Sequence, residues 1–215
     1  MLVLAIDTAT PAVTAGVVAL HTDGPPEPLA TRVTVANRAH GELLMPSVRA
    51  VLAEAGVRAS ELDAVVCGAG PGPFTGLRVG VVTAAAFGDG LGIGVHAVCS
   101  LDAIAHEAGG PVLVATDARR REVYWARYDE AGARVAGPHV ARPADVPTAG
   151  VPCAAGAAAP LLGLPVVSPA YPGAAGLVAV AAAALRCGAV PAPVTPLYLR
   201  RPDAAEPGVP KRVTR

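Results

Sequence analysis

The sequence has very few aromatic residues and almost no lysine. Its 215 residues include one Trp, four Tyr and two Phe, and Lys211 is the single lysine among 17 basic residues. Because 17 acidic residues balance them, the chain has no net charge that would attract nucleic acid or an anionic membrane over a distance. Any contact with nucleic acid would therefore have to be local.

Long apolar runs, a leader segment and cysteine motifs are missing as well. Asp89 and His96 interrupt the longest apolar stretch, which falls short of the ~20 residues that a membrane span needs. The start carries no basic residue and reaches Asp7 too early for a secretory signal. We therefore expect a cytoplasmic protein without membrane contact. The cysteines form no C-x-x-C pair, which argues against zinc and predicts buried, reduced thiols: Cys67, Cys99, Cys153 and Cys187.

Short apolar runs separated by proline and glycine predict a mixed α/β fold. After three strands, an amphipathic helix stops at Gly56 and has Pro46 in its first turn. A nearly all-apolar helix then begins at Thr75, and Ser100 is expected to cap the next one. This order is the plan of an RNase H-like unit. The predicted strands are residues 2–6, 14–20, 29–35, 63–67 and 93–98, and the predicted helices are residues 43–55, 75–87 and 101–108.

The second half of the chain starts the same pattern again, with strands at residues 111–117 and 122–128. Proline and glycine are too frequent from residue 138 to residue 172 for an assignment. An alanine-rich helix is expected at residues 176–187, followed by a proline-rich linker and a basic tail. We therefore predict an α/β protein of two RNase H-like subdomains. These are residues 1–102 and residues 103–215.

The glycine-rich segment GAGPGPFTGLRVG, residues 68–80, looks like a phosphate-binding turn between a strand and a helix. It fails both nucleotide motifs, because Pro73 replaces the third glycine of the dinucleotide fingerprint and the lysine of the P-loop is absent. The glycines still permit a tight backbone path, and Thr75 can cap the helix. An anion on the N–H groups of residues 74–76 is left open.

Two predicted strands end in aspartate, Asp7 and Asp117. An actin-like ATPase keeps the carboxylates that hold magnesium through water at such positions, but the glycines that would let the backbone close on phosphate are absent here. The alternative is that each aspartate closes the turn after its strand. The five histidines form no metal-binding pair, and none of the four serines lies in G-x-S-x-G. The residues therefore predict no catalytic group, no metal and no cofactor; Asp7, Asp117 and Thr75 are weak cofactor candidates only.

A local basic and aromatic segment offers a different function. Arg119, Arg120 and Arg121 precede residues 123–128, which hold three of the aromatic side chains. Arginine beside aromatics suits phosphate contact and base stacking in RNA, whereas an ordinary hairpin would simply expose a charged turn. The tail from Arg200 to residue 215 has five basic residues against two acidic ones. This charge suits a modest contact with a polyanion or an acidic partner. The alternative is that the tail is a frayed end of the chain.

Four segments carry a family resemblance: AIDTAT at residues 5–10, GPGPFTGLR at 70–78, DAR with EVYWARY at 117–119 and 122–128, and PLYLR at 196–200. Taken together they resemble the bacterial TsaB (YeaZ) family, and the resemblance runs from residue 1 to about residue 200. It implies an actin-like (ASKHA) fold and a role in forming N6-threonylcarbamoyladenosine in tRNA. The chain departs from the family at Pro73, where serine is usual.

In that system the resemblance implies a division of labour among subunits. The catalytic subunit TsaD binds a metal through paired histidines, and TsaE is an ATPase. His40 stands where the first metal histidine is expected, but Leu44 replaces the second. The resemblance thus implies a non-catalytic subunit that binds and activates a TsaD-like partner, reaches TsaE and tRNA only through the complex, and forms a homodimer alone. The alternative is an actin-like ATPase or kinase that uses Asp7 and Asp117.

The resemblance implies a partner interface on two helices, residues 43–55 and 75–91. Their composition fits that use, since the second is too apolar for a helix that faces solvent. Its expected residues are Leu44, Val48, Val51, Leu77, Val81, Ala84 and Ala85.

Overall fold

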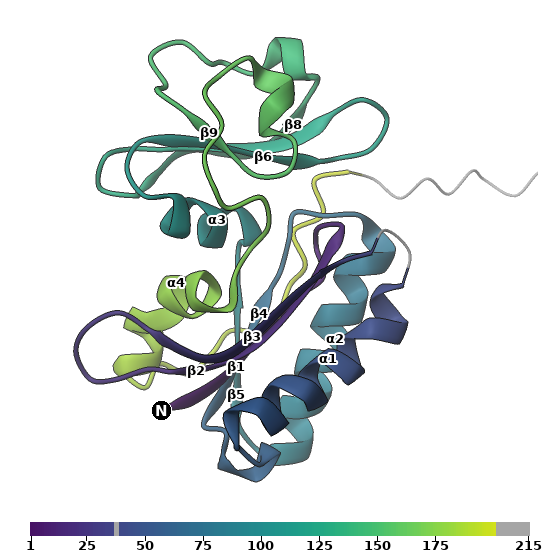
Figure 1. The fold of residues 1–215 in the computed structure, drawn as a ribbon, viewed down its shortest axis with the longest axis vertical. Coiled ribbons are helices and arrows are strands. Elements are labelled where there is room, and N and C mark those ends of the chain that lie inside the picture. Colours follow the sequence, from purple (N-terminus) through teal and green to yellow (C-terminus); the bar gives the residue numbers. More distant parts are fainter. Residues whose placement is uncertain (37–38, 201–215) are drawn as a thin grey trace, which may run out of the picture.

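Two β-sheets form the two lobes of the molecule in a computed structural model that describes residues 1–36 and 39–200 (Figure 1). The first sheet has the order β3-β2-β1-β4-β5. β2 pairs antiparallel with β1 and β3, whereas β1, β4 and β5 are parallel. The strands are β1 (Leu2–Asp7), β2 (Ala12–Ala19), β3 (Glu27–Val35), β4 (Ala64–Gly68) and β5 (Gly94–Val98).

The second sheet repeats the arrangement of the first four strands. Its order is β8-β7-β6-β9, with β7 antiparallel to β6 and β8, and β9 parallel to β6. The prediction that the second half restarts the same unit is confirmed. The strands are β6 (Val112–Asp117), β7 (Val123–Tyr128), β8 (Arg134–Ala141) and β9 (Ala154–Ala155).

Helices cover both faces of the first sheet. Alternate residues of β1 point to opposite faces, so Leu4 packs under α1 and α2 while Val3 packs under α4. α3 contacts β6 and α4, and it therefore lies between the two sheets (Figure 1). The α-helices are α1 (His40–Ala55), α2 (Phe74–Leu91), α3 (Ser100–Ala108) and α4 (Ala174–Arg186), and short 3-10 turns are Ala59–Glu61, Pro143–Asp145 and Ala159–Leu162. None of the helices in residues 1–36 and 39–200 has the length and hydrophobicity of a membrane span.

Proline and glycine account for most differences from the predicted elements. α1 begins at His40, so Pro46 lies in its second turn rather than its first. α2 continues through Gly88 to Leu91, because Gly88 lets the helix approach the Val95 side chain where a Cβ would clash. β8 extends into the stretch too rich in proline to assign, and it tolerates Pro138 because it is an edge strand.

The predicted helix caps are wrong for both α2 and α3. α2 begins at Phe74 after Pro73, so Thr75 lies inside its first turn. α3 begins at Ser100 after Cys99, and the Ser100 hydroxyl bonds to a residue far away in the sequence. At Ser100, a hydrogen bond to this distant residue has therefore replaced the predicted bond to the backbone of the helix.

The division after residue 102 stays a prediction. Residue 102 lies within α3, and its carboxylate joins the lobes because Asp102 Oδ1 accepts hydrogen bonds from Tyr128 at 2.6 Å and Arg134 at 3.0 Å. α4, although it belongs to the second half, forms one core with Val3 and Ala5 of β1.

The cysteines agree with the predicted buried thiols only in part. Cys67 and Cys99 are buried, Cys153 is half-buried and Cys187 is exposed at the end of α4; all four are free. Burial raises the pKa of Cys67 and raises that of Cys99 to about 12, so these two thiols stay protonated. The basic tail lies outside the described residues, apart from Arg200.

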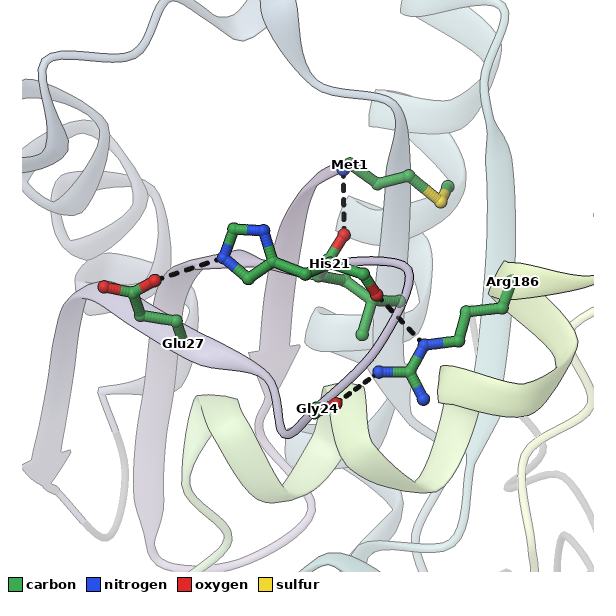
Figure 2. A network of polar contacts seen from close by, with 6 residues as sticks. Met1, His21, Gly24, Glu27 and Arg186 are labelled. Atoms are coloured by element: carbon green, nitrogen blue, oxygen red, sulfur yellow. Dashed lines mark hydrogen bonds and ion pairs between the residues drawn. The ribbon is translucent and has the colours of Figure 1, made fainter.

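The last residue of α4 holds the loop between β2 and β3 (Figure 2). Arg186 Nε donates to the His21 carbonyl at 3.1 Å, and its Nη2 donates to the Gly24 carbonyl. The amino terminus of Met1 reaches the same loop through the Leu20 carbonyl at 2.9 Å. Arg186 thus ties the end of the last helix to the first hairpin.

Arg186→Ala is expected to lower the free energy of unfolding by about 1 kcal/mol, because two hydrogen bonds of an exposed guanidinium are lost. Urea unfolding followed by circular dichroism would measure it. Arg32→Ala is the matched control, since its exposed ion pair with Glu54 contributes about 0.5 kcal/mol or less. An equal loss in both variants would argue against a special role for Arg186.

Candidate functional site

The glycine-rich segment packs against the loop that follows β1. Residues 68, 72, 76 and 80 are all glycine, and a Cβ at any of them would lie less than 3.0 Å from an atom of residues 7–9. The clashing atoms are side-chain atoms of Asp7 for Gly68, backbone atoms of Ala9 for Gly72, the Thr8 carbonyl for Gly76 and the Thr8 hydroxyl for Gly80. The glycines therefore bring two segments of the same chain together.

Thr8 fixes this packing through its side chain. Its hydroxyl donates to the Gly76 carbonyl at 2.7 Å and accepts the Gly80 N–H at 2.8 Å. The first two turns of α2 are thus bonded to the loop after β1. Next to Gly68 and Gly72, the space that a phosphate would need is filled by Asp7 and Ala9.

Asp7 is a buried structural carboxylate. Its side chain is fully enclosed, with Oδ1 accepting the Ala9 N–H at 2.8 Å and Oδ2 accepting the Ser100 hydroxyl. Ser100 Oγ in turn accepts the Gly70 N–H at 3.3 Å, so β1, the glycine turn and α3 meet at this point. Burial raises the pKa of Asp7 to about 6, against the lowering effect of its hydrogen bonds.

Asp117 occupies the equivalent position at the end of β6. Its Oδ1 accepts the Arg119 N–H at 2.9 Å, and Oδ2 lies 3.6 Å from Arg119 Nε. Each aspartate therefore closes the turn after its own strand, which is the second of the two interpretations that the sequence left open.

A cavity of about 380 Å³ lies between the loop after β1 and the starts of α1 and α2, and Arg119 lines it from the second lobe. Of the three cofactor candidates, Thr75 lines it, whereas Asp7 faces into the core. His40 also lines it and donates from Nε2 to the Thr10 carbonyl at 2.8 Å. The lining residues are Thr8, Thr10, Pro11, His40, Gly41, Pro73, Phe74, Thr75, Gly76, Val79 and Arg119.

No metal centre is formed by the part of the chain that the structure describes: nowhere in it do three or more His, Cys, Asp or Glu side chains gather closely enough to hold an ion. Leu44, which stands in place of a second metal histidine, is buried in the core beneath α1.

Five of the seven residues expected at a partner interface belong to the chain's own core, so that part of the prediction is wrong. Leu44, Val48, Val51, Leu77 and Ala84 are at most 1% exposed. They are the faces with which α1 and α2 cover the first sheet, and a charge at Leu44 would test folding rather than association. Val81 and Ala85 are half-buried at the rim of α2.

The outward side of α2 is the apolar surface that remains. Val82 is 64% exposed and Ala86 is exposed, with Val81 and Ala85 on their flank. We call these four residues the α2 stripe. Met45 of α1, which covers the same face of the sheet, is 41% exposed.

Sequence reasoning missed Ser100 as a partner of Asp7 and missed a cluster of Phe74, Arg78 and Tyr198. The spacing of four between glycines was a visible signal for the packing on Thr8. The Phe74–Arg78 contact joins residues four positions apart on one helix, whereas the contacts of Asp7 with Ser100 and of Arg78 with Tyr198 join residues 93 and 120 positions apart and have no local signal.

Comparison with known proteins gives consistent matches. Residues 34–160 match the family profile described as TsaD, tRNA N6-adenosine threonylcarbamoyltransferase. An uncharacterized protein of Mycobacterium tuberculosis is 56% identical over 204 residues, which are 94% of this chain and 93% of that protein. TsaB of Escherichia coli, named as a tRNA threonylcarbamoyladenosine biosynthesis protein, is 37% identical over 139 residues, or 61% of this chain and 58% of that protein.

Solved structures agree with the sequence matches. YeaZ from Pseudomonas aeruginosa gives a TM-score of 0.74 at 30% identity, over 92% of this chain and 99% of that chain. A second structure, described as an uncharacterized protein with similarity to the peptidase YeaZ from Pseudomonas aeruginosa, gives a TM-score of 0.76 at 31% identity over 93% of this chain and 99% of that chain. The predicted actin-like (ASKHA) fold of two RNase H-like halves is confirmed. The chain belongs to the TsaB (YeaZ) family.

Proposed function

We propose that this chain is a non-catalytic scaffold subunit in the formation of N6-threonylcarbamoyladenosine in tRNA, and that it binds and activates a catalytic subunit of the TsaD type. Its homology to TsaB, named for that biosynthesis, supports the pathway. The observation that carries the scaffold role is the exposed α2 stripe, which lies within a run of ten uncharged residues from Val79 to Gly88.

An apolar helix face in water favours association. Each Å² of apolar surface removed from water contributes about 25 cal/mol, and specific protein pairs bury about 1,600 Å² in total. The α2 stripe and Met45 lie on neighbouring helices, so a partner helix could cover both. The same face would also serve a homodimer, so homodimer and heterodimer should compete; contact with a TsaE-like ATPase and with tRNA would follow through the complex.

The two carboxylates support the non-catalytic part of the proposal. Asp7 and Asp117 both bond to the backbone of their own turns, and Asp7 faces the core rather than the cavity. An actin-like ATPase or kinase would need such carboxylates to face a bound magnesium ion. Calorimetry that found micromolar binding of magnesium ATP would favour that alternative instead.

Val82→Glu is expected to weaken association with the cognate TsaD-type subunit about thirty-fold, because a charge would be buried in a desolvated contact. Sedimentation velocity of mixtures would measure the dissociation constant. Val82 is 64% exposed, so the melting temperature should stay close to that of the unaltered chain.

Val135→Glu is the control for that experiment. Val135 is 56% exposed, but it lies on β8 in the other lobe. The Val135→Glu variant should bind the TsaD-type subunit as tightly as the unaltered chain does. Equal binding by Val82→Glu would show that the partner uses a different face.

A further inference from the structure

We propose that the turn between β6 and β7 and the aromatic side chains beside it form a binding surface for single-stranded RNA. The surface consists of the arginine turn, Arg119, Arg120 and Arg121, and of an aromatic pair, Phe74 and Tyr198. This goes beyond the scaffold role, which needs a protein partner on the α2 stripe. The two proposals can therefore fail separately.

The arginine turn has an unusual backbone. Its residues have φ angles of 62°, 53° and 62°, in the left-handed region that side chains other than glycine rarely adopt. The turn is closed by the Ala118 N–H, which donates to the Glu122 carbonyl at 3.0 Å, and by the Glu122 N–H, which donates to the Arg119 carbonyl at 2.9 Å. Such strain gathers at sites that clamp ligands. Here it holds three consecutive arginine side chains in exposed positions.

The aromatic pair lies at the start of α2. The rings of Phe74 and Tyr198 have centroids 5.0 Å apart, and their residues are 37% and 41% exposed. Arg78 lies with its guanidinium carbon 3.8 Å from the centroid of the Phe74 ring, and its Nε donates to the Tyr198 hydroxyl at 3.2 Å. The guanidinium group fixes both rings and leaves aromatic surface open to solvent.

A shared cavity and an ion pair between neighbouring residues place the aromatic pair near the arginine turn. Phe74 and Arg119 line the same cavity of about 380 Å³. The segment after α4 runs from the first lobe to the second (Figure 1), and within it Arg200 makes an ion pair with Glu122 directly after the turn. A ring of the first lobe, Phe74, and a cation of the second, Arg119, therefore line one hollow.

The charge of this region favours a polyanion. Among the described residues, the guanidinium groups of Arg78, Arg119, Arg121 and Arg200 lie in this region with two carboxylates, Asp117 and Glu122, which pair with Arg119 and Arg200. The excess is positive although the whole chain has a net charge of zero. Arginine contacts phosphate, and exposed rings stack on unpaired bases. An acidic peptide would use the charges but leave the rings without a role, so single-stranded RNA fits better.

The test is fluorescence anisotropy of the full chain with a labelled, unstructured oligoribonucleotide of about 12 nucleotides. The double variant Arg119→Asn with Arg121→Asn should bind at least about ten-fold more weakly at about 50 mM salt, and should lower the slope of log affinity against log salt by about 1.4. Asparagine is chosen because it tolerates the left-handed backbone. Phe74→Leu should weaken binding about five-fold at every salt concentration, because it removes stacking and no charge.

Arg58→Glu is the matched control, with the same change of two charge units. Arg58 is exposed and pairs with Glu61 before β4, at the opposite end of that strand from the glycine turn. The Arg58→Glu variant should bind the oligoribonucleotide as tightly as the unaltered chain does. Circular dichroism checks that each variant is folded, and binding of the TsaD-type subunit by the same variants should be unchanged.

Several outcomes would overturn the proposal. They are a failure of the full chain to bind the oligoribonucleotide at about 50 mM salt, an equal loss of affinity in the Arg58→Glu variant, and equally tight binding of an RNA duplex of the same charge. A loss confined to Lys211→Asn with Arg212→Asn would place the contact in the tail instead, outside the described residues.

Discussion

Gly72→Ala is expected to prevent folding, or to lower the free energy of unfolding by more than about 4 kcal/mol. A Cβ at residue 72 would lie less than 3.0 Å from three backbone atoms of Ala9, its O, C and Cα. That backbone is held on both sides, because the Ala9 N–H bonds to Asp7 and the Thr8 hydroxyl bonds to α2. Neither segment has room to move apart without breaking these bonds.

Gly90→Ala is the matched control for that substitution. Gly90 lies near the end of α2, and a Cβ there would meet no atom within 4 Å. Alanine is a better helix residue, so this variant should gain about 0.5–1 kcal/mol. Urea unfolding would measure both. If Gly72→Ala were as stable as the unaltered chain, the glycine turn would not be packed on the loop after β1.

Asp7→Asn is expected to remove a pH dependence of about 3 kcal/mol from the stability of the protein. The pKa of Asp7 is about 6 in the folded chain, above its ordinary value of 3.8, because the carboxyl is buried. The folded state therefore holds this proton more tightly than the unfolded state. The stabilisation is present below pH 4 and is lost as the pH rises to about 6, after which the contribution stays constant.

The measurement compares unfolding free energies at pH 4 and pH 7 in the unaltered chain and in Asp7→Asn. The unaltered chain should lose about 2.5 kcal/mol more than the variant over this interval, because the unfolded carboxyl is already partly ionised at pH 4. Asp7→Ala should be less stable at both pH values by about 2–4 kcal/mol, because the Ala9 N–H and the Ser100 hydroxyl lose their partner. Parallel profiles for the unaltered chain and Asp7→Asn would contradict a raised pKa.

The sequence predicted the fold better than it predicted contacts between distant residues. Alternating and helical periodicity located β1 to β7 and all four α-helices, because burial of one face imposes a period on the side chains. The structural positions of two prolines were not predicted correctly. Pro46 does not mark the first turn of α1, and Pro138 is admitted to β8 because an edge strand has N–H groups that pair with no neighbour.

Site prediction failed where a local pattern has two physical meanings. An apolar helix residue can face its own sheet or another protein, and Leu77 and Val82 of α2 cannot be told apart by residue type although one is buried and the other exposed. Asp7 and Asp117 gave the same ambiguity between magnesium and a turn, and their hydrogen bonds to the backbone of the following turns, which favour the turn, are seen only in the structure. Periodicity depends on residues that are close in the sequence, whereas these distinctions depend on residues that are distant in the sequence and close in the fold.

The packing of α4 on β1 affects how the protein is made on the ribosome. Val3 and Ala5 are synthesised long before Leu177 and Val178, which cover them. Until α4 has been made, one face of the first sheet stays uncovered, and contacts over such a separation form slowly. The nascent chain therefore carries an apolar surface while the segment between β1 and α4 is synthesised, and a chaperone that shields it would protect the chain from aggregation.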